Sequence, residues 1–370
     1  MTGVAARIDA LRASPDGGAE LLALLAEQSP AYAGLGSGEA ERLRGYAMAS
    51  FETLGLPDVA LPSVMEALET GYAAYSLAAA ARALRGAPDP PEDAARILLR
   101  AVARLARHDE VVVFDRFDAY FPDPAAGPAT TGLTELFRTF AWLGPRARSA
   151  LGAIEKMRAE RRFSPQVRAA IDAAIEAIAA APELAPSPCC AKAAAPATAC
   201  TATLDDIELQ DQHGATLRFA KAFHGRPTLL AFFYTRCTNA QKCPTTIARL
   251  GQLQRLLATE GLAHRINLAA ISYDPGYDLP ARLLGYGQAL GLVFDARARL
   301  WRTTGPFEPL RAALDLGVGY GQATVNQHRI ELFVLDSRGR VAEAIVRRSW
   351  RPEEALVALR GLLEPAGEAA

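Results

Sequence analysis

The chain carries five cysteines, and two of them lie on one short loop where they could act together. Cys237 and Cys243 are separated by the five residues TNAQK. This separation allows both sulfurs to face one point, either as a disulfide or as two ligands of a soft cation. An odd number of cysteines, all in the second half of the chain, is not typical of a secreted disulfide scaffold. The pattern therefore favours a metal or redox site.

The residues on either side of this loop predict the elements that would position the two sulfurs. The run from Thr228 to Tyr234 has almost no polarity, which predicts a central strand buried on both faces. Pro244 suits the first position of a helix, where its missing N–H costs nothing, so we expect Cys243 to be the N-cap. A thiol there would face unpaired amides and the positive end of the helix dipole. We therefore expect the pKa of the Cys243 thiol to be lowered.

The other three cysteines, Cys189, Cys190 and Cys200, lie in the Ala/Pro-rich segment 181–203. This segment has too few large apolar residues to pack, so we expect a linker. The adjacent Cys189 and Cys190 would be strained as a disulfide, but either could pair with Cys200, or all three could bind one soft metal ion. They are thus either auxiliary thiols beside the dithiol loop or inert exposed thiols.

Residues 1–180 predict an all-α domain, because the sequence there is rich in Ala, Leu and Arg with helical periodicity. Turns containing Pro or Gly separate the segments 61–86, 90–114, 131–157 and 164–178. This spacing is that of stacked helical hairpins and indicates a HEAT-like repeat, with an irregular helical bundle as the alternative. Ser63 and Glu66 are expected to form a capping box, Gly86 to end a helix, and Ser164 with Pro165 to begin one.

From Leu204 onward the pattern changes to alternating strands and helices. Beside the cysteine loop we expect a hairpin around His213-Gly214, a buried strand over 267–272, a helix over 279–290, a hairpin over 329–346 and a helix over 353–363. This order is that of a thioredoxin-like α/β fold. The expected organisation is an α-helical domain over 1–180, a linker over 181–203, a thioredoxin-like domain over 204–363 and a tail over 364–370.

Four stretches of the second half resemble the Sco/SenC family, whose members are copper-binding proteins with a thioredoxin fold. They are FFYTRC at 232–237, the Cys243-Pro244 pair, SYDPGYDLP at 272–280 and HRIELFVLD at 328–336. The resemblance implies that Cys237, Cys243 and His328 are the metal ligands. Two thiolates and one imidazole form a small, soft site that suits Cu(I), and a further weak ligand would let it hold Cu(II).

The sequence departs from the family pattern at three places. Five residues separate the two cysteines, whereas three are usual in the family. The membrane anchor or export signal that is usual in the family is not found in the sequence as written, and the helical region 1–180 is foreign to the core family. Within the matching turn, Leu279 stands where the family has threonine. Outside the implied ligand set, His224 and His264 are expected to be surface residues, and Asp274 is expected to form a turn.

Three functions follow from these observations. The resemblance implies a copper-binding protein that acts as a metallochaperone or a copper-linked thiol reductant. The second possibility is a thiol–disulfide oxidoreductase that cycles Cys237 and Cys243, with the linker cysteines as resolving partners. The third is an interaction scaffold in which the helical repeat binds a protein partner and the redoxin domain is inactive. In each case we expect the helical domain to be the surface for a protein partner.

Composition excludes several other classes of function. The formal net charge is −1, so no basic field points to nucleic acid. No apolar segment approaches the roughly 18 residues of a membrane span, and residues 1–18 lack the pattern of a signal peptide. The sequence as written therefore predicts a soluble cytoplasmic protein, whereas a different start site would leave a periplasmic or membrane-associated role open.

Overall fold

The computed structural model describes residues 3–117, 130–160, 162–180 and 204–363. The chain divides into two compact units. The first consists of residues 1–192 together with 319–327, and the second consists of residues 193–318 and 328–370. Cys189, Cys190 and Cys200, which the sequence marked as auxiliary thiols, lie outside the described residues.

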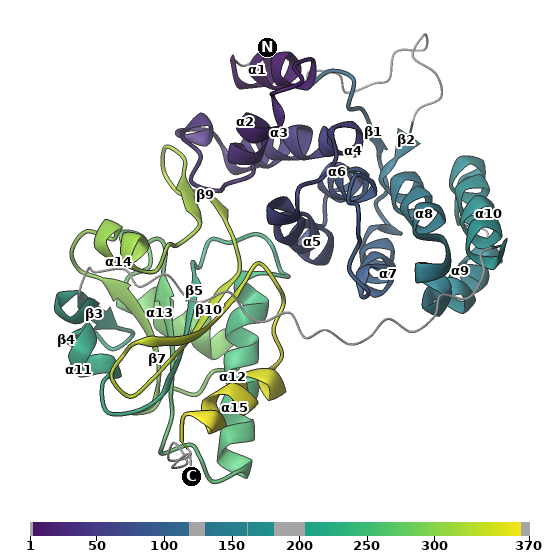
Figure 1. Cartoon of the computed structure of the whole chain (residues 1–370). Coiled ribbons are helices and arrows are strands. Elements are labelled where there is room, and N and C mark those ends of the chain that lie inside the picture. Colours follow the sequence, from purple (N-terminus) through teal and green to yellow (C-terminus); the bar gives the residue numbers. More distant parts are fainter. Residues whose placement is uncertain (1–2, 118–129, 161, 181–203, 364–370) are drawn as a thin grey trace, which may run out of the picture. The chain divides into compact units, whose positions relative to one another are not determined.

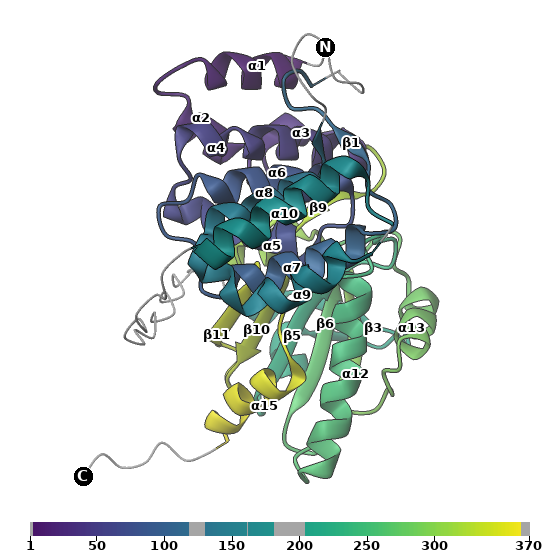
Figure 2. The same cartoon turned by 90° about the vertical axis from the view of Figure 1, so that its right-hand side faces the viewer.

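The first unit is α-helical, which confirms the predicted class of the N-terminal region (Figures 1 and 2). Its helices are α1 (Gly3–Arg12), α2 (Gly18–Ala23), α3 (Ser37–Ala49), α4 (Phe51–Leu54), α5 (Leu61–Thr70), α6 (Ala74–Arg85), α7 (Ala94–Leu105), α8 (Gly132–Leu143), α9 (Leu151–Arg158) and α10 (Pro165–Ala180). The short strands β1 (Val111–Val112) and β2 (Thr130–Thr131) pair antiparallel.

Helix α6 is the centre of this unit, because α3, α5 and α8 all pack against it. Half of its residues are buried alanines, and such small side chains let neighbouring helices approach on several sides. The large apolar residues of α7 and α10 lie mostly on one side of each helix and are buried in the core. The helical character is thus explained by packing, while the HEAT-like repeat stays a prediction.

Two of the three predicted helix boundaries are confirmed. Gly86 is the C-cap of α6, and the Ser164 hydroxyl accepts a hydrogen bond from the Val167 amide at the start of α10. The predicted capping box at Ser63 is wrong. Helix α5 begins two residues earlier, at Leu61, and Ser63 is buried inside it. Pro62 accounts for the earlier start, because proline suits the first turn of a helix.

The second unit is built on a seven-stranded mixed sheet with the order β11-β10-β5-β6-β7-β3-β4. Its strands are β3 (Glu208–Asp211), β4 (Thr216–Arg218), β5 (Thr228–Phe233), β6 (Asn267–Ser272), β7 (Ala298–Thr303), β10 (Glu331–Leu335) and β11 (Val341–Val346). Strands β5, β6 and β7 are parallel, and every residue of β5 and β6 is buried. The predicted central strand is therefore confirmed.

Helices cover this sheet and complete the predicted thioredoxin-like fold. They are α11 (Phe219–Phe223), α12 (Cys243–Thr259), α13 (Pro280–Ala289), α14 (Glu308–Ala313) and α15 (Pro352–Gly361). Helices α12 and α15 contact each other and both pack on β5, so they share one face of the sheet (Figure 2). Helix α13 instead packs against β7 and β3. Strand β7 and helix α14 were not predicted from the sequence.

A hairpin late in the chain joins the helical unit. Strands β8 (Val318–Tyr320) and β9 (Val325–His328) pair with each other. Residues 319–327 belong to the first unit, whereas Val318, which begins β8, and His328, which ends β9, belong to the second. A parallel bridge links Gly34 to Gly321. No sequence pattern indicated that the chain leaves the thioredoxin-like unit here.

Within the described ranges, every helix is too short or too polar to cross a lipid bilayer. The apolar residues of α12 instead face the sheet, and Leu250 on this helix is 0% exposed. The position of α12, and with it the position of the cysteine loop, thus depends on core packing.

Substituting Leu250→Ala should lower the free energy of unfolding by about 2–5 kcal/mol, because it removes buried methyl groups and leaves a cavity. Chemical denaturation followed by tryptophan fluorescence checks this, since Trp301 and Trp350 are both buried in the second unit. Val357→Ala on α15 is the control, because Val357 is 69% exposed and its truncation should change stability by no more than about 0.5 kcal/mol. Equal losses in the two variants would contradict this account of α12.

Candidate metal centre

The loop after β5 reverses the chain within a few residues and begins α12. The Cys237 amide donates a hydrogen bond to the Tyr234 carbonyl at 3.3 Å, and the Lys242 amide donates to the Asn239 carbonyl at 3.0 Å. Helix α12 starts at Cys243, with Lys242 as its N-cap. The prediction that Cys243 is the N-cap is therefore wrong by one residue. Pro244 nevertheless lies in the first turn, as predicted.

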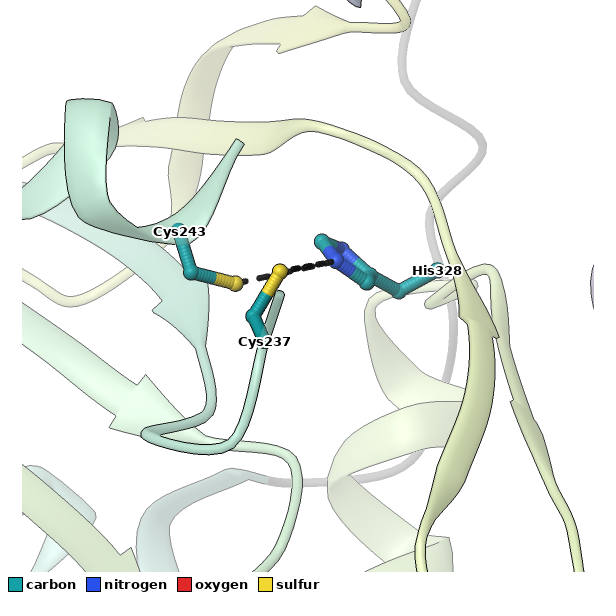
Figure 3. Close-up of side chains that lie close together, drawn as sticks. All are labelled: Cys237, Cys243 and His328. Carbon is teal, nitrogen blue, oxygen red and sulfur yellow. Dashed lines mark hydrogen bonds between the residues drawn. The ribbon is translucent and has the colours of Figure 1, made fainter. Parts of the chain in front are cut away.

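The structure brings together the three side chains that the sequence marked as ligands (Figure 3). Nε2 of His328 lies 3.4 Å from Sγ of Cys237 and 3.6 Å from Sγ of Cys243. One donor atom from each residue lies within 4.8 Å of the others, which is close enough to hold a metal ion. Cys243 is 1% exposed and His328 is 8% exposed, whereas Cys237 is only partly buried. Cys237 is thus the side of the site nearest to solvent.

The imidazole of His328 is oriented as a ligand through Nε2. Its Nδ1 lies 3.2 Å from the Arg329 carbonyl oxygen, which can only accept a hydrogen bond. Nδ1 must therefore carry the proton when this bond is made, and Nε2 then presents its lone pair to the two sulfurs. A hydrogen bond at the far nitrogen is the usual device that fixes the tautomer of a metal-binding histidine.

Two tyrosine rings surround the imidazole and separate it from water. The ring of Tyr234 meets that of His328 edge-on with centroids 5.4 Å apart, and the ring of Tyr273 lies 5.6 Å away. Tyr273 is fully buried, and Tyr234 is 7% exposed. These rings lower the local polarity, so that charge on the sulfurs is less screened than it would be in water.

The two thiols have opposite shifts in pKa. A hydrogen bond from Cys243 lowers the pKa of Cys237, and the nearby His328 lowers it further. Burial raises the pKa of Cys243, and its hydrogen bond to Cys237 adds to that rise. The expectation that Cys243 has the lowered pKa is therefore wrong. Its sulfur lies at the start of a helix, but complete burial outweighs the helix dipole.

Two aspartates from the turn after β6 hold the loop in place. The carboxylate of Asp278 is fully buried and accepts hydrogen bonds from the Thr235 amide, the Thr235 hydroxyl and the Ser272 hydroxyl. Asp274 forms an ion pair with Arg236, directly before Cys237. Asp274 also accepts backbone bonds within its own turn, as predicted, but its ion pair was not anticipated.

Lys242 links the cysteine loop to the histidine. Its Nζ donates a hydrogen bond to the His328 carbonyl at 2.7 Å. Lys242 is one of the five residues between the cysteines, so the loop itself is hydrogen-bonded to the backbone of His328. Three residues after His328 in the sequence, the buried Glu331 accepts hydrogen bonds from the Tyr273 hydroxyl, the Gly317 amide and the Arg329 guanidinium.

Sequence reasoning missed these supporting residues for different reasons. Asp278 lies in the SYDPGYD stretch, so its motif was visible although its role was not. Lys242 carries no local signal, because its partner lies 86 residues away. Two of the three partners of Glu331 lie 14 and 58 residues away, so its role was not visible in the local sequence either. His264, expected at the surface, is exposed, and His224 is 37% exposed with Asp205 as its partner.

The donor set suits a soft cation of low coordination number. Thiolates favour soft ions, and imidazole is compatible with them. No fourth Cys, His, Asp or Glu of the described residues joins the cluster, whereas a structural zinc site would need one. The same two sulfurs could also form a disulfide, so the site can support either metal binding or thiol chemistry.

Comparisons with known proteins place this unit among relatives. The sequence model of the SCO1/SenC family matches residues 197–364. Similar solved structures include copper-bound ScoI of Bradyrhizobium japonicum, with 26% identity over 42% of this chain and 96% of that one at a TM-score of 0.34. A SCO1/SenC family lipoprotein of Bacillus anthracis shows 21% identity over 44% and 95% of the two chains, at a TM-score of 0.38. Copper-bound yeast Sco1 shows 18% identity over 44% and 89%, at a TM-score of 0.36. No curated protein matches the chain.

Replacing Cys243→Ala should raise the pKa of Cys237, because the substitution removes the hydrogen bond that favours its thiolate. Alkylation by iodoacetamide requires the thiolate, so the wild-type rate at Cys237 should persist at a pH where an ordinary thiol has lost its reactivity. In the variant, the rate should fall at a higher pH than in the wild type. Mass spectrometry of the reduced, metal-free chain locates the modification.

Free glutathione in the same reaction provides the reference for an unperturbed thiol. Identical pH profiles for Cys237 in the wild type and in Cys243→Ala would show that the second sulfur does not set its pKa.

Proposed function

We infer that this chain, whose residues 197–364 match the sequence model of the SCO1/SenC family, is a copper-binding protein that holds Cu(I) on Cys237, Cys243 and His328. The observation that carries this proposal is the convergence of two sulfurs and the Nε2 atom of one imidazole within 4.8 Å. The three residues come from the loop after β5, the start of α12 and the end of β9. Two sulfurs and one imidazole nitrogen at such distances can all contact one metal ion.

The chemistry of the donors supports Cu(I) over other common ions. Soft sulfur ligands stabilise Cu(I), and a site with three donors leaves no requirement for a fourth. Binding must displace the proton that the two thiols share, so affinity should fall as pH is lowered. The buried tyrosine rings beside His328 reduce screening on that side of the site, which strengthens the attraction between thiolates and a cation.

The unequal exposure of the two sulfurs favours transfer of the metal. Cys243 is 1% exposed, whereas Cys237 is only partly buried. A recipient's ligand would therefore reach the metal at Cys237, displace that thiolate first, and leave Cys243 and His328 until last. This order supports a metallochaperone. A copper-linked thiol reductant is the related activity that the same sulfurs could perform.

We expect one tight Cu(I) site in the reduced full-length protein, measured anaerobically by competition with a chromophoric chelator. Cys237→Ala, Cys243→Ala and His328→Ala should each weaken affinity by at least about 100-fold, since even residues behind the ligands of a metal site contribute about 10–100-fold. Serine replacements at Cys189, Cys190 and Cys200 in all variants restrict the measurement to this site.

His264→Ala is the matched control, because it removes an exposed imidazole in the same unit that lies outside the cluster. Its affinity should equal that of the parent protein. Absence of a tight site in the parent, or unchanged affinity in Cys243→Ala, would end the copper proposal.

One observation favours a second function, a thiol–disulfide oxidoreductase. Cys237 combines a lowered pKa with partial exposure, which are the properties of an attacking thiolate. In that reaction the Cys237 thiolate would attack a substrate disulfide and form a mixed disulfide. Cys243 would then attack the Cys237 sulfur and release the substrate as a thiol. The substrate gains two electrons and two protons, and a Cys237–Cys243 disulfide forms.

This second function predicts that a Cys237–Cys243 disulfide forms reversibly in glutathione redox buffers. The fraction of the oxidised form, read by thiol trapping and mass spectrometry, should give a defined reduction potential. Cys243→Ala should stop at the mixed disulfide with glutathione. A pair that cannot be oxidised in any buffer would rule out this function and leave copper binding untouched.

A further inference from the structure

The residues directly before His328 are held by the helical unit. The chain leaves the thioredoxin-like unit at Val318, passes through residues 319–327 as part of the first unit, and returns at His328. The base of this hairpin is closed in the second unit, where the Arg329 amide donates a hydrogen bond to the Gly317 carbonyl. Its tip is closed by a bond from the Gly321 amide to the Thr324 carbonyl.

Asn326 makes the main polar contacts of this segment. Its Nδ2 donates hydrogen bonds to the Tyr32 carbonyl at 2.8 Å and to the Leu35 carbonyl at 3.1 Å. The Gly34 amide donates a third bond to the Tyr320 carbonyl at 3.3 Å. Asn326 is 6% exposed, so these carbonyls would lose buried partners if its amide were removed.

Two glycines allow the hairpin backbone to approach the helical unit closely. A Cβ atom added to Gly319 would lie 2.3 Å from the Glu27 carbonyl oxygen, and one added to Gly321 would lie 2.5 Å from the Leu35 carbonyl oxygen. Both obstacles are backbone atoms, which cannot rotate away. The contact therefore requires glycine at these positions, and even one methyl group would push the hairpin outward.

The same strand, β9, carries both Asn326 and the possible metal ligand His328. Asn326 is two residues from His328, and all four residues of β9 are buried. Useful coordination demands donor distances within about 0.2 Å of the ideal value. A shift of the β9 backbone by even half an ångström would thus take the imidazole out of the position that coordination needs.

We propose that the helical unit is a positioning element of the metal centre, which sets the place of the His328 imidazole by holding the segment 319–327, with Asn326 as the positioning residue. This proposal rests on the copper-binding function. It gives the helical unit a role in the site without any of its residues touching the metal. Because coupling between sites is reciprocal, copper bound at His328 should in turn tighten the hairpin on the helical unit.

The first test compares Gly321→Ala with Gly38→Ala in the full chain. A Cβ at Gly38 in α3 meets no atom within 4 Å, so the control makes the same chemical change in the same unit without disturbing the hairpin. Gly321→Ala should weaken Cu(I) affinity by about 10–100-fold, as is typical of residues that orient a ligand, and Gly38→Ala should leave it unchanged. Asn326→Leu, which removes the amide but keeps similar volume, should behave like Gly321→Ala.

A double-mutant cycle separates positioning of the histidine from general destabilisation. In a His328→Ala background, Gly321→Ala should have no further effect on Cu(I) affinity, because the ligand that it displaces is already absent. The same loss in both backgrounds would overturn the proposal, as would unchanged affinity in both Gly321→Ala and Asn326→Leu.

A metal-free readout distinguishes failure of this proposal from failure of the copper function. Hydrogen–deuterium exchange of the full chain should be faster in Gly321→Ala and Asn326→Leu, both in peptides covering residues 325–331 and in peptides covering residues 27–36. If these peptides exchange as in the wild type, the helical unit does not hold the hairpin, whatever the protein binds. If exchange rises in these variants but neither they nor the wild type bind copper, the helical unit does hold the hairpin and the copper function fails.

Discussion

The close approach of two sulfurs in a largely buried place is the constraint on which the site depends. Cys237 and Cys243 lie in a largely buried environment where two thiolates would repel each other strongly, so one thiol donates to the other and their pKa values move in opposite directions. A cation can replace that proton, and oxidation can remove it. The surrounding residues keep the two sulfurs close enough for these exchanges, and the burial of Cys243 limits screening by water on its side of the pair.

The fold meets this requirement by anchoring each side of the loop to a different element. Strand β5 is buried on both faces and fixes where the loop begins, while core packing of α12 fixes where it ends. Between them, Asp278 satisfies the Thr235 amide and hydroxyl, and Lys242 joins the loop to His328. Five residues separate the two cysteines, and the contact from Lys242 lies within this stretch, so the sulfurs converge although the loop between them is long.

Local patterns explain why much of this arrangement was predictable. The apolar runs of β5 and β6 and the proline at the start of α12 are signals that depend on neighbouring residues alone. The expected ligand set came from the resemblance of the stretches around Cys237, Cys243 and His328 to the Sco/SenC family. The pKa order of the thiols was not predictable, because burial of Cys243 depends on the whole fold. The same holds for Asp278, Lys242 and the excursion of residues 319–327, whose partners are remote in sequence. Ser63 failed for a local reason, since Pro62 shifted the start of its helix.

The contact of the hairpin with the helical unit also has an energetic consequence for ligand binding. A histidine on a free loop must be ordered when it binds a ligand, and fixing each backbone residue costs roughly 1–2 kcal/mol. Hydrogen bonds from Asn326 and the close approach at Gly321 order β9 in advance, so this cost is met during folding rather than at binding. If the site holds copper as proposed, the helical unit raises its affinity for the metal without supplying any donor atom. Any change that loosens the helical unit around Tyr32 and Leu35 would then lower that affinity from a distance.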